Sequence, residues 1–513
     1  MSLSQSMSIS LDSMRNNQYA LAVVSHNIAN LNTQGYARQR VNFSEDRYLV
    51  NSNSVIAKIN AMQGADLASI SNYVDASAFR GLVNSNADAN YYNGLADALS
   101  ELEDVADDLG DNGLNALLGD FYSAAANLEQ FPTDLSIRQQ YVMALDNVCD
   151  KFNYIMDRYN TIQEDKFNEV DTAAFNINSL LSDLAAVNLT HIKNGQGAST
   201  QGDINAILAE LSNYANISYD QNPNGSYNVY FGGVAVVQGT EQVFEFQANY
   251  DETASEPLTL SLQSLKDTSK IVNINNSITT GSLKSAIDFL NGSSSTVGFS
   301  TVKDMKAAVL SAETAFKDAL NGIQTYSDTT NDIYAAYITS SNGSLVLASD
   351  GGSPDMPLTP PDILQWGANG ELVVNSQVMD NPFFVAVARV NLNDYAAGED
   401  WTQSIGNNAN AGYIVDLQNQ KICSYGGGTN NCTLSQFLIN NAAKNGMDLS
   451  SMQNKAELYQ GIADSDAQDY ANITGVNLDE ELADMIRYQR AYEASAAIFS
   501  VINNIMQTII GMV

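Results

Sequence analysis

The chain is poor in the residues on which most catalytic and metal sites are built. Its 513 residues include two histidines, three cysteines, two tryptophans and eight prolines. His26 and His191 leave no material for a histidine-based metal site or for a serine–histidine–aspartate triad. The sequence also has no glycine-rich phosphate-binding loop and no acidic residues at the spacing of a calcium-binding loop. We therefore expect a protein that is not an enzyme and that has no cofactor and no metal.

Basic residues are also scarce. Lys and Arg number 23 against 58 acidic residues, for a formal net charge of −35. Nucleic-acid binding needs clustered cations to neutralise phosphates, so the composition argues against it, and an anionic membrane would repel the chain. We see no apolar run that approaches the roughly 18 residues of a membrane span. The expected partners therefore include no nucleic acid and no membrane, and the charge favours solubility.

Three cysteines in so long a chain exclude a disulfide scaffold. Cys423 and Cys432 flank a short loop rich in glycine and asparagine, and this nearness permits a local disulfide across a hairpin. Cys149 lies on a helical pattern and is most simply a buried apolar residue.

The N-terminus lacks the basic cluster and apolar core of a Sec-type signal peptide, since its first basic residue is Arg15. If the protein leaves the cytoplasm, we expect it to do so without a cleaved signal peptide.

Both ends of the chain carry an apolar column at seven-residue spacing. Such a column indicates a helix that packs against a partner helix. The simplest way to bury both columns is for the chain to fold back and pair its termini as a stem. Polar residues interrupt the flanking columns, so a two-helix stem would leave apolar surface in water and favour association with copies of itself. The columns are Met7, Met14, Leu21 and Ile28 at the start, and Leu478, Met485, Tyr492, Phe499, Met506 and Val513 at the end.

Between the ends, helical and strand-like patterns alternate. Apolar residues at 3/4 spacing predict a helical rod of about 55 residues from Tyr141 onward, and further helices from about Val302 to Tyr337 and near both 435–444 and 454–513. Period-two alternation from Ile217 to Val236, with a turn at 222–225, predicts a β-hairpin.

We therefore predict an α+β multidomain protein with a helical coiled-coil stem, an elongated helical bundle and β-rich inserted domains. The stem would comprise residues 1–40 and 475–513. The helical bundle would comprise 41–195, 300–343 and 434–474, with β-rich inserts at 196–299 and 344–433.

Two terminal segments carry a family resemblance. The segment from Val23 to Gln39 contains Asn27-Ile-Ala-Asn30, Thr33 and Gly35-Tyr36, and it resembles the N-terminal signature of the axial proteins of the bacterial flagellum. Residues 475–495 resemble the C-terminal signature of the same family.

Three details are more similar to the junction proteins between hook and filament than to hook or rod subunits. They are the segment Tyr36-Ala-Arg-Gln39, the segment Glu493-Ala-Ser495 and residues 113–139. Two alternatives stay open: a hook or rod axial subunit, and, from a different class, a secreted adhesin that binds through its β domains.

The resemblance implies a structural protein of the flagellum that joins hook to filament as a ring of subunits. It further implies an extracellular location after type III export. The implied partners are other copies of the chain, the hook protein, a second junction protein and an export chaperone at the C-terminal helix. We also expect both ends to be largely unfolded before assembly, because each column has too little to pack against. The residues expected to pack the stem are Met7, Met14, Leu21, Ile28, Leu482, Met485, Tyr492, Phe499 and Met506, and those expected to shape the turn are Asn27, Asn30, Thr33, Gly35 and Tyr36.

Overall fold

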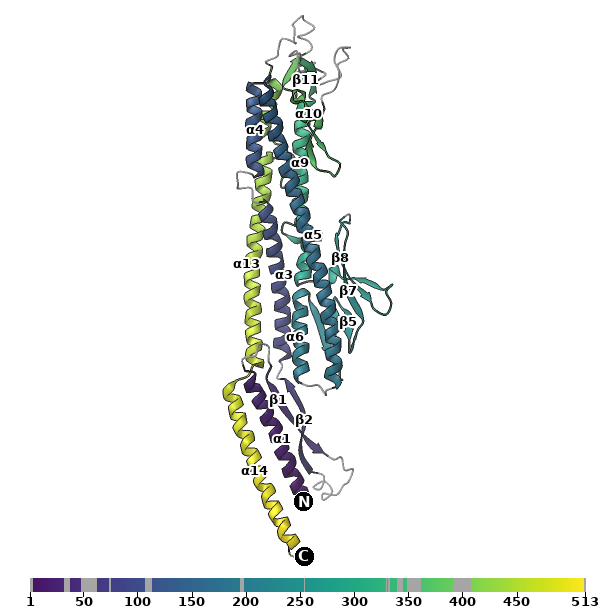
Figure 1. The fold of residues 1–513 in the computed structure, drawn as a ribbon, viewed down its shortest axis with the longest axis vertical. Coiled ribbons are helices and arrows are strands. Elements are labelled where there is room, and N and C mark those ends of the chain that lie inside the picture. Colours follow the sequence, from purple (N-terminus) through teal and green to yellow (C-terminus); the bar gives the residue numbers. More distant parts are fainter. Residues whose placement is uncertain are drawn as a thin grey trace.

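The computed structural model shows an elongated molecule with both termini at one end (Figure 1). It describes residues 3–31, 37–47, 62–72, 75–106, 113–193, 198–252, 254–328, 330, 333–338, 345–347, 361–391 and 407–511. Long helices run along most of its length, and the small sheets lie at its side and at both of its ends.

The terminal end of the molecule is a stem of two helices and a hairpin. Helix α1 (Leu3–Ala29) lies beside α14 (Leu478–Gly511), as Figure 1 shows. The antiparallel strands β1 (Gln39–Arg47) and β2 (Met62–Asn72) pack against α1. We predicted that residues from 41 onward would belong to the helical bundle, but the hairpin buries Val41 beside Ala20 and Val23 of the stem.

The body is a bundle built on two long helices, α5 (Leu135–Lys193) and α13 (Leu434–Thr474). Helix α3 (Ala76–Ala106) packs along α13, and α4 (Leu114–Gln130) packs on α5. Two shorter helices, α6 (Ala198–Tyr214) and α9 (Val302–Gln324), complete it. The 59 residues of α5 span about 90 Å at 1.5 Å per residue. One continuous core joins these helices, with Phe121, Tyr141, Phe152 and Phe316 fully buried in it.

The first β insert lies on the side of α5. Its strands are β3 (Ile217–Gln221), β4 (Tyr227–Phe231), β5 (Val234–Gln238) and β6 (Glu241–Gln242) in one sheet, and β7 (Phe244–Tyr250), β8 (Leu258–Ser264) and β9 (Ile271–Asn273) in another. Strands β3 and β4 form the expected hairpin around the turn at 222–226. A 3-10 turn (Asn275–Ser277), α7 (Ser282–Asn291) and α8 (Ser294–Val297) lead back to the bundle.

The second insert lies at the end of the molecule away from the termini (Figure 1). Its strands are β10 (Ser327–Asp328), β11 (Ile333–Ile338), β12 (Leu345–Leu347) and β15 (Ala388–Asn391) in one sheet, and the pair β13 (Leu364–Trp366) and β14 (Leu372–Val374). Short helices α10 (Ser376–Asp380) and α12 (Ala409–Asp416) and 3-10 turns at Pro382–Phe384 and Leu417–Asn419 accompany them.

Asparagines on the helices attach both inserts to the body. The carboxamide of Asn178 on α5 donates to the carbonyl of Phe246 at 2.8 Å and accepts from the amide of the same residue at 2.7 Å. Asn188 pairs with Tyr227 in the same way, and Asn153 with Leu372 of the second insert. A carboxamide offers one donor and one acceptor side by side, as a neighbouring strand does. Each of these asparagines therefore satisfies strand backbone that would otherwise lose its partners on burial.

Two sequence expectations differ from the structure. The helix expected from Val302 to about Tyr337 ends at Gln324, and the following residues form β10 and β11. The helices expected near 435–444 and 454–513 are instead α13, continuous to Thr474, and α14. Alanine and aromatic residues in 333–338 fit a strand as well as a helix, so periodicity alone does not separate the two.

The C-terminal helices contain one stretch that is apolar enough, by length and composition, to cross a membrane. Within Leu434–Gly511 an 18-residue window has a mean hydropathy of 1.3, and only 6% of it is buried. We expected no such stretch, because no continuous apolar run approaches the roughly 18 residues of a membrane span. Asn503 and Asn504 interrupt the apolar residues of α14. The finding identifies an exposed apolar helix, and helices that pack against other proteins have the same composition.

The buried Glu313 of α9 provides a test of the bundle. Its side chain is 3% exposed, and burial raises the pKa of its carboxyl from 4.5 to about 7. Folding therefore favours the protonated form. The stability that the raised pKa of Glu313 contributes is fully present below about pH 4.5 and is lost as the pH rises through about 7. Between these values we expect the free energy of unfolding to fall by about 3 kcal/mol more in the wild type than in Glu313→Gln.

Urea unfolding followed by circular dichroism across this pH range measures the difference. The Gln variant is the matched control, because it keeps the shape of the side chain and removes its titration. Parallel pH dependences for the two proteins would contradict the assignment.

Candidate assembly site

The seam between the two stem helices is narrow and partly polar. Ala20, Val23 and Val24 are buried on α1, whereas only Glu481, Ser495 and Ile502 are buried on α14. The hydroxyls of Ser13 and Ser495 share a hydrogen bond of 2.8 Å across the seam, and Gln18 donates to the hydroxyl of Tyr492 at 3.4 Å. Small side chains let the helices approach closely here, but they bury little apolar area.

None of the residues predicted to pack the stem is fully buried. Leu482 is 42% exposed. The others are half-buried: Met7, Met14, Leu21, Ile28, Met485, Tyr492, Phe499 and Met506. Their role in packing stays a prediction, and the structure leaves part of each surface available for further contacts.

A second apolar column runs along α14 outside the seam. Ile498, Val501, Ile505 and Ile509 follow one another at intervals of three or four residues, so they share one face of the helix. Their exposed fractions lie between 44% and 58%. Leu478, Leu482 and Ile486 are similarly exposed near the start of α14. The stem thus presents to solvent more large apolar side chains than it buries.

Asn27 ties the end of α1 to the start of β1. Its carboxamide is fully buried, donates to the carbonyl of Gln39 at 2.9 Å and accepts from the Gln39 amide at 3.0 Å. The same carboxamide nitrogen donates to Oε2 of Glu481 on α14 at 3.0 Å. One side chain therefore connects three elements, and we call the group Asn27, Arg38, Gln39 and Glu481 the clasp.

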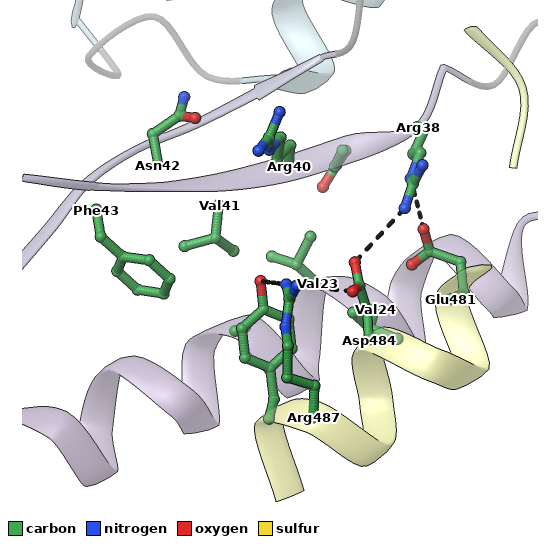
Figure 2. A pocket seen from close by; sticks show the side chains of 13 residues that line it. Val23, Val24, Arg38, Arg40, Val41, Asn42, Phe43, Glu481, Asp484 and Arg487 are labelled. Carbon is green, nitrogen blue, oxygen red and sulfur yellow. Dashed lines mark hydrogen bonds and ion pairs between the residues drawn. The ribbon is translucent and has the colours of Figure 1, made fainter. Parts of the chain in front are cut away.

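Arg38 completes the clasp through carboxylates on the first turns of α14. Its guanidinium lies 2.6 Å from Glu480, 2.6 Å from Glu481 and 3.6 Å from Asp484, and Figure 2 shows it facing Glu481 and Asp484. Burial on its own would lower the pKa of Arg38, but the charges of Glu481 and Glu480 outweigh it and raise that pKa above its ordinary value. The guanidinium therefore stays charged and holds these acidic residues together.

The clasp also reaches the body. The amide of Arg38 donates to the carbonyl of Thr474, the last residue of α13, at 2.8 Å. Between α13 and α14 the chain leaves the helix at Gly475, where an added Cβ would lie 2.4 Å from the carbonyl oxygen of Ala471. Asn477 then caps α14 by accepting from the amide of Asp479 at 3.0 Å. Helix α1, strand β1 and both C-terminal helices thus meet at one point.

A cavity of about 680 Å³ opens beside the clasp (Figure 2). Val23, Val41 and Phe43 form its apolar side, and Arg38, Glu481, Asp484 and Arg487 its charged side. The carboxylates there are paired with arginines, since Asp484 also lies 3.1 Å from Arg487. No group of histidine, cysteine, aspartate or glutamate among the described residues has the arrangement of a metal site.

The remaining predicted residues are those of the turn after α1 and the two cysteines. Asn30 donates to the carbonyl of His26 at 2.9 Å, so it ends α1 locally. Thr33, Gly35 and Tyr36 lie outside the described residues. Cys423 and Cys432 face each other in an isolated antiparallel bridge of the body, outside the stem, and both thiols are free.

A family model described as the helical domain of the flagellar hook-associated protein FlgK matches residues 99–333. Models of the flagellar basal body rod protein and of the C-terminal part of the rod proteins FlgEFG match residues 9–36 and 467–512, which form most of the stem. The flagellar hook-associated protein 1 of Bacillus subtilis (strain 168) is 24% identical over 96% of this chain and 95% of its own length.

The helical-domain model and the full-length relative confirm the predicted similarity to flagellar hook-associated protein 1. The solved structure of the flagellar hook junction protein FlgK from Burkholderia pseudomallei has the same fold, with a TM-score of 0.56 and 11% identity over 76% of this chain and 98% of that one. The predicted α+β multidomain fold and the predicted structural role in the flagellum are confirmed. These matches do not favour a hook or rod subunit or an adhesin, because the helical-domain model and the full-length relative are both hook-associated.

Arg38, Gln39 and Glu481 lie in the terminal segments that carry the family resemblance, but the sequence predicted no role for them. The available signal was local: Gly475 and Asn477 mark a helix end and a helix cap, so the acidic residues after them occupy the first turn of a new helix. Their partner Arg38 is more than 400 residues away along the chain, and nothing in its own neighbourhood points to them.

The clasp predicts a specific effect of Asn27→Ala. The variant leaves the backbone of Gln39 and the carboxylate of Glu481 without their buried partner, at a cost of about 1–3 kcal/mol. We therefore expect the Gln39 amide to exchange with solvent deuterium at least tenfold faster, as measured by hydrogen exchange on the full chain. Asn30→Ala is the matched control, because Asn30 bonds within its own turn. Equal Gln39 exchange in the wild type and the Asn27 variant would contradict the role of the clasp.

Proposed function

We propose that this protein joins the flagellar hook to the filament as a ring of copies held together by their stems. The observation that carries the proposal is the exposed apolar column of α14. Ile498, Val501, Ile505 and Ile509 face solvent in the single chain although they lie beside a helix partner. Contiguous apolar surface of this kind marks a protein–protein interface.

The energetics favour neighbouring stems as the cover for this surface. Burying apolar area stabilises an interface by about 25 cal/mol per Å², so each half-exposed isoleucine contributes about 1 kcal/mol when a neighbour covers it. Several such residues in every copy, repeated around a ring, would hold the assembly together. A stem helix of a second copy has the right length and the same spacing of apolar side chains, so copies of the chain are suitable partners.

The clasp gives this ring a defined geometry. Arg38 and Asn27 fix the start of α14 relative to α1, β1 and the end of α13. The stem would therefore project from the body in one orientation in each copy. The body and its β inserts would then face away from the tube formed by the stems.

Export and location follow from the same proposal. Beyond the clasp, stem helices that bury little of their own surface would be largely unfolded in the single chain, which suits passage through a type III export channel and capture of the C-terminal helix by an export chaperone. The assembled protein would be extracellular, exported without a cleaved signal peptide, and in contact with the hook protein and a second junction protein. This role requires no catalysis, so we infer that the protein is not an enzyme.

Substitution of Ile498 tests the proposed interface. Ile498 is 55% exposed, so Ile498→Asp should leave the folded body unchanged and place a charge in the interface between copies. We expect cells that carry this variant to secrete the protein and to form hooks that lack filaments. Electron microscopy of the cells and detection of the protein in the medium measure both effects.

Asn504→Asp is the matched control, because it adds the same charge at a polar, exposed position of the same helix. It should retain filaments. Full motility and normal filaments with Ile498→Asp would contradict the proposed interface.

A further inference from the structure

Two cysteines of the body form an isolated antiparallel bridge. Cys423 and Cys432 lie directly opposite each other, and the amide of each donates to the carbonyl of the other at 3.2 Å. The thiol of Cys432 also donates to the carbonyl of Cys423 at 3.4 Å. Both side chains are buried, with 2% and 6% of their surface exposed, and both thiols are free.

This backbone arrangement fits a disulfide bond. Residues that exchange both hydrogen bonds across antiparallel strands have Cα atoms about 5.5 Å apart and side chains on the same face. Disulfides span Cα separations of about 4.4–6.8 Å. The Cβ atoms of a hydrogen-bonded pair lie toward the upper end of about 4.5–5.5 Å, and a disulfide needs about 3.5–4.5 Å. Rotation of the two side chains, together with an approach of the two backbone segments by about 1 Å, would therefore bring the sulfurs together.

We propose that Cys423 and Cys432 are a disulfide site, closed by thiol–disulfide exchange with a low-molecular-weight disulfide. One thiol gives up its proton and attacks the small disulfide, which forms a mixed disulfide and releases one small thiol. The second cysteine then attacks the mixed disulfide and releases the other small thiol. Two protein thiols are oxidised to one disulfide, and one small disulfide is reduced to two thiols that carry the two protons.

The surroundings favour exchange while the chain folds. Burial raises the pKa of Cys423 to about 12 and also raises the pKa of Cys432, although the charge of Lys421 partly offsets the rise at Cys432. The thiolate is the reactive form, so the closed loop protects the thiols and the open loop exposes them. Most residues between the two cysteines are exposed, which gives the reagent access when the loop opens.

The disulfide would fix the beginning of α13. Thr433 follows Cys432 directly and caps α13 by accepting from the amide of Gln436. Within the loop, Tyr425 packs edge-on against Phe437 at 6.2 Å and donates to the carbonyl of Asn440 at 3.2 Å. A covalently closed loop would keep Tyr425 in contact with the first turns of α13, the helix that leads to the clasp.

Thiol counting on the purified full chain tests the proposal. The reduced protein is incubated with excess oxidised glutathione, denatured without reductant and alkylated with N-ethylmaleimide. We expect one adduct per chain, at Cys149, and three adducts when reductant is added first. We also expect oxidation to raise the melting temperature of the body by about 3 °C.

Three variants complete the test. Cys423→Ser and Cys432→Ser should lose the gain in melting temperature, whereas Cys149→Ser should keep it. Three adducts after oxidation, or glutathione that remains attached to Cys423 or Cys432, would overturn the proposal. The measurement needs no flagellum, so its failure would leave the proposed role at the hook untouched, and loss of that role would leave the thiol count unchanged.

Discussion

The main physical constraint on this structure is that the two stem helices bury little apolar surface against each other. Helices α1 and α14 meet along a seam that encloses Ser495 and Ile502 on one side and Ala20 and Val23 on the other. Small and polar side chains bring the helices close together, but they leave the larger apolar residues of α14 in solvent. Because burial of apolar surface is the main stabilising term in folding, we propose that neighbouring copies complete this pair of helices. The body has a continuous core and does not share this deficit.

Polar contacts fix the orientation of the stem, because its apolar packing is too limited to do so. The clasp satisfies the backbone of Gln39 with Asn27 and gathers the acidic first turn of α14 around Arg38. The same device recurs where Asn178 and Asn188 attach the first β insert to α5, and where Asn153 holds the second. A carboxamide replaces a neighbouring strand in each case, so helices and strands join without a shared sheet edge. The long helices thus position both inserts and the stem.

Parts of this architecture could be predicted from the sequence because their signals are periodic. The rod of α5 and the hairpin of β3 and β4 have strong local patterns, and the terminal columns correctly indicated helices at both ends. The end of α9 was missed because residues 333–338 suit either a helix or a strand. The clasp was missed for a different reason. Asn27 and Glu481 are 454 residues apart, and a hydrogen bond between such distant residues leaves no periodic trace in either segment.

Hydrogen exchange of α14 in two states tests most directly whether neighbouring copies complete the stem. The purified chain is compared with the same protein in isolated flagella. The account predicts that amides around Ile498, Val501 and Ile505 exchange rapidly in the purified chain and become protected in the flagellum, while the core of α5 is protected in both. Strong protection of α14 out to its last turns in the purified chain, with no gain in the flagellum, would contradict it.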